Sequence, residues 1–195
     1  SKGNMWFGLL HRGIVKFDGH SFTHFKLRKE SQYEDIRSLM EDSKGNMWFR
    51  SSLDGTVAKY DGSHFTYYSH AGSNETDTFL EDSLGNIWMT GSGGSGIIKY
   101  NGKEFYQFTE QHGLTDNRTK SLMQDKAGNI WIGTKSGLNY FENPLGKPGI
   151  PSRIINFDSN DGLIGEDFQP NAALIDSKEN AWWGTNKAVH KLNLK

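Results

Sequence analysis

Pairs of adjacent acidic residues are the first candidates for chemistry in this sequence. They are Glu34-Asp35, Glu41-Asp42, Glu81-Asp82 and Glu166-Asp167. A glycosidase needs two carboxylates about 5–10 Å apart on either side of a sugar, whereas neighbours on a strand point to opposite faces. The pairs at 41–42 and 81–82 stand at equivalent places of successive repeats. Turn formation therefore explains them better than catalysis does.

Seven histidines are the second candidates, for metal binding or for acid–base chemistry. They fall on expected loops (His11, His70 and His112) or in or beside expected strands (His20, His24, His64 and His190). No His-Glu-x-x-His, calcium-loop or glycine-rich phosphate-loop motif is present, and the chain has no cysteine. We therefore predict no cofactor and no metal, and we expect each histidine to be a solvated or locally bonded polar residue.

A third set emerges when the repeats are aligned on the aspartate that ends a short apolar run. These aspartates are Asp42, Asp82, Asp125 and Asp176. Five residues before them stand polar residues of different charge, namely Arg37, Asp77, Lys120 and Asn171. Strand ends are often polar because water is near, and this explanation stays open. A ligand site is the alternative, because otherwise similar repeats differ here, as a site built once would require.

A repeat that runs through the whole chain must position these candidates. Its signature is Gly-Asn-x-Trp at 3–6, 45–48, 85–88 and 128–131, with a degenerate copy at 179–182 in which Glu179 replaces the glycine. A tryptophan thus recurs about every 40 to 50 residues, which is typical of repeat architectures. No long 3.6-residue periodicity is present, so the repeats are expected to consist of strands.

Each repeat predicts four antiparallel strands, which we term strands A to D. Strand A is the apolar run before the aspartate, and strand B carries the tryptophan among β-forming residues. Strand C ends at a hairpin signal, Asp18-Gly19, Asp61-Gly62 or Asn101-Gly102, and strand D follows. The sequence therefore predicts an all-β fold, a β-propeller of four-stranded antiparallel blades, with the tryptophans buried between blades.

The 195 residues are expected to form a single β-propeller domain. Its units are approximately 1–33, 34–74, 75–116, 117–166 and 167–195. The first unit lacks strand A and the last lacks strand D, so the chain is either an imperfectly closed five-blade ring or part of a larger one. Because open blades expose strand edges, we expect self-association through the terminal blades.

The fourth unit is irregular, because three of the four prolines fall between residues 142 and 151. Proline cannot donate to a sheet ladder, so this stretch is expected to be a surface loop between strands C and D. Strand D of this unit is then expected at residues 153–157.

Charge and hydropathy exclude two classes of partner. The formal net charge is −1, whereas a nucleic-acid-binding protein needs a basic face. No apolar run is long enough to span a membrane, so no membrane insertion by this chain is expected.

The pattern Asp-x-x-Gly-Asn-x-Trp-x-Gly-Thr at 125–134, with Asp-Gly-x-x-Phe in other repeats, resembles the two-component regulator propeller repeat. The stretch 161–173 is similar to the segment that opens the final blades of that family, and the resemblance covers essentially the whole chain. The family occurs in periplasmic sensor regions of bacterial hybrid two-component histidine kinases. The resemblance implies a non-enzymatic, extracytoplasmic sensor region that binds a small molecule or an oligosaccharide.

Two other functions stay open. A streptogramin-lyase-like propeller enzyme would use a histidine, a glutamate and a divalent metal, and His112 with Glu110 is the best candidate pair. A protein-interaction platform would instead show a large apolar patch on one face.

Ligand contact is expected on the face formed by the loops between strands B and C and between strands D and A. These loops differ between repeats, whereas the turns at the other end are nearly identical, and function tends to lie on variable loops of a rigid scaffold. The ligand-contacting residues expected on this face are Tyr33, Arg37, Asp77, His112, Arg118, Lys120 and Asn171.

Overall fold

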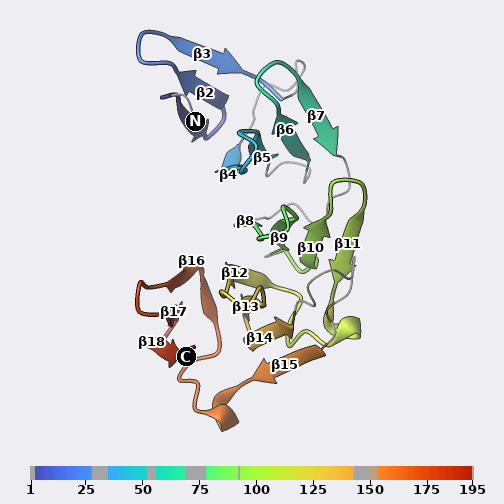
Figure 1. The fold of residues 1–195 in the computed structure, drawn as a ribbon, viewed down its shortest axis with the longest axis vertical. Helices are drawn as coiled ribbons and strands as arrows, with labels where there is room; N and C mark the ends of the chain where they lie inside the picture. The colour runs from blue at the N-terminus through green and yellow to red at the C-terminus, as the bar shows by residue number, and fades with distance from the viewer. Residues whose placement is uncertain are drawn as a thin grey trace. The chain divides into compact units, whose positions relative to one another are not determined.

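The computed structural model describes residues 3–27, 35–51, 56–68, 78–91, 93–142, 151 and 153–194. The chain divides into two compact units, Ser1–Thr76 and Asp77–Lys195, and each is described by itself. In the described residues, eighteen strands form five antiparallel sheets, each in the order of the chain or its reverse (Figure 1). The predicted all-β fold of three- and four-stranded blades is confirmed.

The first unit contains two of the sheets. One consists of β1 (Met5–Leu9), β2 (Gly13–Phe17) and β3 (Phe22–Phe25), and the other of β4 (Ile36–Glu41), β5 (Met47–Ser51), β6 (Val57–Tyr60) and β7 (Phe65–Tyr68). Trp6 of the first sheet packs against Phe49 and Tyr60 of the second, with ring centroids 5.6 and 5.5 Å apart. The two sheets therefore share one aromatic core.

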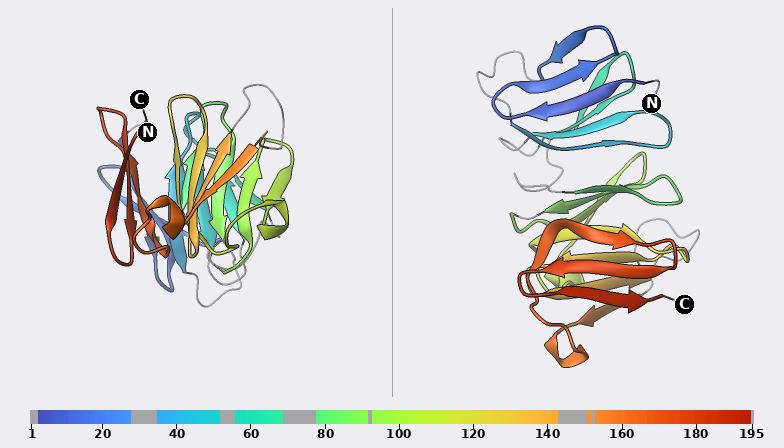
Figure 2. Two further views of the ribbon diagram at one scale, coloured as in Figure 1. Left: turned by 90° about the horizontal axis from the view of Figure 1, so that it is seen from below. Right: turned by 90° about the vertical axis from the view of Figure 1, so that its left-hand side faces the viewer.

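The second unit contains the other three sheets. The first is β8 (Phe79–Glu81), β9 (Ile87–Gly91), β10 (Gly96–Tyr100) and β11 (Phe105–Phe108); the second is β12 (Thr119–Gln124), β13 (Ile130–Thr134), β14 (Gly137–Glu142) and β15 (Arg153–Phe157). The third is β16 (Phe168–Ile175), β17 (Asn180–Thr185) and β18 (Val189–Asn193), seen side by side in Figure 2. Two 3₁₀ turns, η1 (Glu110–His112) and η2 (Ser159–Asp161), precede β12 and β16.

Tryptophans from strand B join neighbouring sheets of the second unit. Trp88 packs with Ile130 and Phe141 of the following sheet, and Trp131 packs with Trp183 of the sheet after that, at 5.5 Å between ring centroids. Their exposed fractions are only 2% and 6%. The predicted burial of these tryptophans between blades is confirmed.

One aspartate organises each turn between strands A and B. Asp82 Oδ1 accepts a hydrogen bond from the Asn86 backbone N–H at 2.9 Å, and Asp82 Oδ2 accepts one from Trp88 Nε1 at 2.8 Å. The same bonds form around Asp42, Asp125 and Asp176. In the last turn Glu179 takes the place of the glycine, with a positive φ of 64°. The degenerate fifth repeat therefore keeps the geometry of the others.

Strand A begins earlier than the apolar pattern predicts. β12 starts at Thr119 and β16 at Phe168, whereas the apolar runs start at residues 122 and 172. The additional residues include polar ones next to a β-bulge, which interrupts the alternation that marks a strand in a sequence. By contrast, β15 occupies Arg153–Phe157 as predicted, and residues 143–150 of the proline-containing loop lie outside the described residues.

We predict that Trp88→Ala lowers the free energy of unfolding by about 3–5 kcal/mol, because it opens a cavity between two sheets. Urea denaturation would measure the loss. Val189→Ala is the control, because Val189 is 71% exposed and its truncation should change stability by less than about 0.5 kcal/mol. Equal effects of the two substitutions would contradict the packing described here.

Candidate functional site

The two loops that enter β12 and β16 share one local structure. In the first, His112 Nδ1 accepts a hydrogen bond from the Thr109 backbone N–H at 3.1 Å; in the second, Asp161 Oδ2 accepts one from the Asp158 backbone N–H at 3.0 Å. Each 3₁₀ turn then ends at a glycine with φ near 100°, Gly113 or Gly162. His112 therefore caps a turn, in the place that an aspartate takes in the next repeat.

Hydrogen bonds also close each of these loops and tie it to the neighbouring loop between strands B and C. Glu110 Oε1 accepts the Asn117 backbone N–H at 2.9 Å, and Asn117 Oδ1 accepts the Glu110 backbone N–H at 2.8 Å. The Asn117 carbonyl accepts the Gly96 N–H at 2.7 Å, and the Glu166 carbonyl accepts the Gly137 N–H at 3.1 Å. Within the second unit these loops consequently form one hydrogen-bonded face.

β-Bulges mark the polar residues that stand five positions before the turn aspartates on strand A. The extra, unpaired residue is Arg37 in β4 and Lys120 in β12. Asn171 lies in a wider irregularity of β16 and has a positive φ of 55°. A bulge re-aims the side chain that it carries, so the alignment on the aspartates identified a structurally equivalent position.

Thr78 joins the beginnings of three consecutive strands A in the second unit. Its hydroxyl lies 2.6 Å from Asn171 Oδ1 and 3.2 Å from the Lys120 carbonyl oxygen. Residues that are 93 positions apart in the sequence thus meet at one hydroxyl. The Lys120 backbone and the Asn171 side chain therefore meet at Thr78, whereas ligand contact by these two residues stays a prediction.

The other predicted site residues have different placements. Arg37 is exposed in the first unit, whereas Lys120 and Asn171 belong to the second. Tyr33 and Asp77 lie outside the described residues. For these residues, as for the others predicted, ligand contact stays a prediction.

Arg118 presents a positioned cation on the same face of the second unit. Its Nε atom lies 2.8 Å from Asp116 Oδ1, and Ser136 Oγ donates to Asp116 Oδ2 at 2.8 Å. The hydrogen bonds from Arg118 hold the pKa of Asp116 at about 2. Asp116 is buried, whereas the Arg118 side chain is 46% exposed. Arg118 is thus held by one side and can donate hydrogen bonds with the other.

The side chains of His112 and Glu110, the candidate pair for a metal-dependent lyase, are both hydrogen-bonded within their own loop. His112 caps η1, and Glu110 accepts from Asn117. Among the described residues, no group of three or more histidine, aspartate or glutamate side chains could hold a metal ion. No helix in that same part of the chain is long and apolar enough to cross a membrane.

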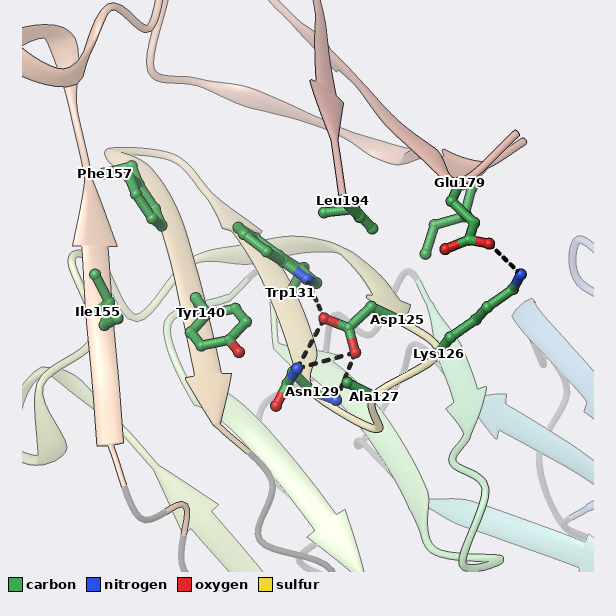
Figure 3. A pocket seen from close by; sticks show the side chains of 11 residues that line it. Asp125, Lys126, Ala127, Asn129, Trp131, Tyr140, Ile155, Phe157, Glu179 and Leu194 are labelled. Atoms are coloured by element: carbon green, nitrogen blue, oxygen red, sulfur yellow. Dashed lines mark hydrogen bonds and ion pairs between the residues drawn. The ribbon is translucent and has the colours of Figure 1, made fainter. Parts of the chain in front are cut away.

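Sequence reasoning missed a pocket of about 540 Å³ at the other end of the strands, between the sheets β12–β15 and β16–β18 (Figure 3). Trp131, Tyr140 and Phe157 line it together with Asp125 and Leu194. One sequence feature could have pointed to this pocket: strand C of this repeat carries Tyr140 where the other repeats carry lysine.

Residues 113–136 match the two component regulator propeller family. The fold is similar to extracellular domains of two hybrid two-component systems of B. thetaiotaomicron, with 20% and 21% sequence identity and TM-scores of 0.78 and 0.75. These matches cover 100% of this chain but only 27% and 28% of those chains. Virginiamycin B lyase from Staphylococcus aureus is also similar, at 12% identity and a TM-score of 0.70 over 99% of this chain and 67% of the lyase. No curated protein sequence matches.

The pKa of Asp116 predicts an acid-sensitive contribution to stability. The folded-state value, about 2, lies below the ordinary 3.8, so the ionised carboxylate stabilises the fold above pH 4 or so and this contribution is lost as the pH falls toward about 2. We expect Asp116→Asn to be less stable than the parent at pH 5 and to lose less stability between pH 5 and pH 2.5. Urea midpoints at the two pH values would measure both. An equal loss in both proteins would contradict the prediction.

Proposed function

Since residues 113–136 match the two component regulator propeller family, we propose that the chain is a non-enzymatic, ligand-binding part of an extracytoplasmic sensor region in a bacterial periplasm. We further propose that it recognises carbohydrate fragments. The likeness to extracellular domains of hybrid two-component systems supports this proposal.

The observation on which the proposal mainly depends is the meeting of three sheets at Thr78. Lys120 and Asn171 come from different repeats, yet both contact this hydroxyl through a backbone or side-chain oxygen. The side chains of Lys120 and Asn171 differ in charge. The turns at the opposite end of the strands, by contrast, keep the same hydrogen bonds between Asp, Asn and Trp in each repeat. A ligand that contacts several repeats at once would account for this difference.

The chemistry of this face suits a ligand rich in hydroxyl groups. Lys120 supplies three N–H donors, Asn171 supplies an amide, and the half-exposed guanidinium of Arg118 supplies a planar set of donors. The hydrogen-bonded loops around them hold their backbone in place. Little ordering is therefore required when the ligand binds, which favours affinity.

A non-enzymatic function is favoured by the engagement of Glu110 and His112 in loop closure. The likeness to virginiamycin B lyase keeps a metal-dependent lyase as the alternative. Turnover of a substrate that stops on addition of a chelator would support the lyase and contradict the sensor proposal.

We predict that Arg118→Ala and Lys120→Ala together weaken the binding of a recognised glycan by about 10- to 100-fold, the loss of one or two polar contacts. A panel of oligosaccharides titrated by calorimetry would first identify the glycan. Lys178→Ala is the matched control, because Lys178 is an exposed lysine in the turn at the other end of the strands. Unchanged affinity in the double variant would place the site elsewhere.

We also propose self-association through the last sheet. Trp88 and Trp131 are each covered by the following sheet, whereas Trp182, the equivalent residue of β17, is half-buried. Leu174, paired with Trp182 in the ladder, is 57% exposed. This open apolar face is comparable to the faces that other sheets bury, so a second copy of the chain is a suitable partner.

We expect sedimentation velocity to show a concentration-dependent dimer or larger assembly that Leu174→Lys dissociates, because a charge would be buried at the contact. Leu84→Lys is the matched control: Leu84 is a similarly exposed leucine, at 52%, in the turn between β8 and β9. A monomer at all concentrations, or equal effects of both variants, would refute this proposal.

A further inference from the structure

The residue that faces the repeat tryptophan across the ladder differs in one sheet. Four sheets pair the tryptophan of strand B with a lysine of strand C: Trp6 with Lys16, Trp48 with Lys59, Trp88 with Lys99, and Trp182 with Lys191. The sheet β12–β15 pairs Trp131 with Tyr140 instead. Among the five repeats, only this one lacks the lysine.

In the other four sheets the lysine ammonium occupies a defined place over the indole ring. Nζ lies 5.0 to 5.7 Å from the ring centroid, the distance of a cation–π contact. Lys99 is only 4% exposed; burial lowers its pKa, while the negative charge of Asp82 acts in the opposite direction. In the repeat of Lys99, the turn aspartate and the indole ring together therefore form an ammonium-binding place.

The same carboxylate and the same indole are present in the exceptional sheet. Asp125 accepts hydrogen bonds from Asn129 N at 2.9 Å and from Trp131 Nε1 at 3.1 Å. Tyr140 packs against Trp131 with ring centroids 4.6 Å apart. Lys126, the one lysine among the described lining residues, has its Nζ 2.5 Å from Glu179 Oε1 instead (Figure 3). The repeat thus keeps the carboxylate and the indole, but strand C supplies a phenol ring in place of an ammonium ion.

The pocket beside Asp125 has the size and lining for an external cation. Its volume is about 540 Å³, within the usual range for small-molecule sites. Three aromatic residues, Trp131, Tyr140 and Phe157, line it, and Figure 3 shows them on neighbouring strands of one sheet. Asp125 brings a negative charge to the pocket, and burial followed by that charge raises the pKa of Tyr140.

We propose that this pocket binds a small organic ammonium ion, whose cation lies beside Asp125 and supplies the positive charge that a lysine of strand C brings in the other four sheets. The aromatic rings contact its carbon atoms and its positive charge, and Asp125 supplies the opposing charge. The pocket lies at the other end of the strands from the proposed carbohydrate face. It is therefore a second site, independent of the proposed function.

The test uses n-butylammonium chloride, which carries the ammonium and the four carbons of a lysine side chain. The indole N–H resonance of Trp131, assigned by its disappearance in Trp131→Phe, should shift saturably as the salt is added. The Trp88 resonance should not, because Lys99 already occupies that place. Sodium chloride and n-butanol, at matched concentrations, should leave both resonances unchanged. An equal shift with n-butanol would reduce the site to an apolar pocket and overturn the proposal.

Substitutions at Tyr140 provide the second arm. Tyr140→Lys restores the lysine of the other repeats, so its own ammonium should compete and weaken n-butylammonium binding at least tenfold. Tyr140→Phe is the matched control and should bind within about threefold of the parent. Undiminished binding by a folded Tyr140→Lys variant, or no saturable shift of Trp131 in the parent chain, would overturn the proposal.

Discussion

The aspartate of each turn between strands A and B holds the tryptophan of the following strand, and the rest of each blade depends on that bond. Asp42, for example, accepts from the Asn46 backbone and side chain and from Trp48 Nε1, all within 3.0 Å. Burial alone would raise the pKa of Asp42, but the bonds from Trp48 and Asn46 outweigh it and lower the pKa. One carboxylate thus fixes the turn and allows an indole N–H to be buried without an unsatisfied donor.

This constraint explains why so much of the fold could be predicted from the sequence. Asp, Gly, Asn and Trp must stand at fixed spacing for the bonds to form, so the repeat is visible even where Glu179 replaces the glycine. The alternating strands and the Asp-Gly hairpins followed from local chemistry in the same way. Even β15 was located, as the strand expected after the proline-containing loop.

The candidate site was predictable only in part, because its residues meet through contacts that no local pattern records. Aligning the repeats located Lys120 and Asn171, but not Thr78, whose hydroxyl joins them. Nor did the pattern show that His112 and Asp161 are equivalent caps, since a histidine and an aspartate differ in size, shape and charge. The pocket beside Trp131 depends on packing between two sheets, which spacing alone does not specify.

A repeat protein offers an internal reference that a single sequence otherwise lacks. Where the repeats have the same residue, as at the turn aspartate, the hydrogen bonds that they share explain why that residue is present. Where one repeat has a different residue, the contacts in the other repeats show which interaction is missing. Lys120 and Asn171 depart at a bulge, where the backbone constrains side-chain type little. Tyr140 departs where the other four repeats place a lysine over an indole ring, and its own repeat retains the carboxylate and the indole. The departure at Tyr140 is therefore the more informative one, because the lysines of the other repeats indicate which chemical group would bind in the exceptional repeat.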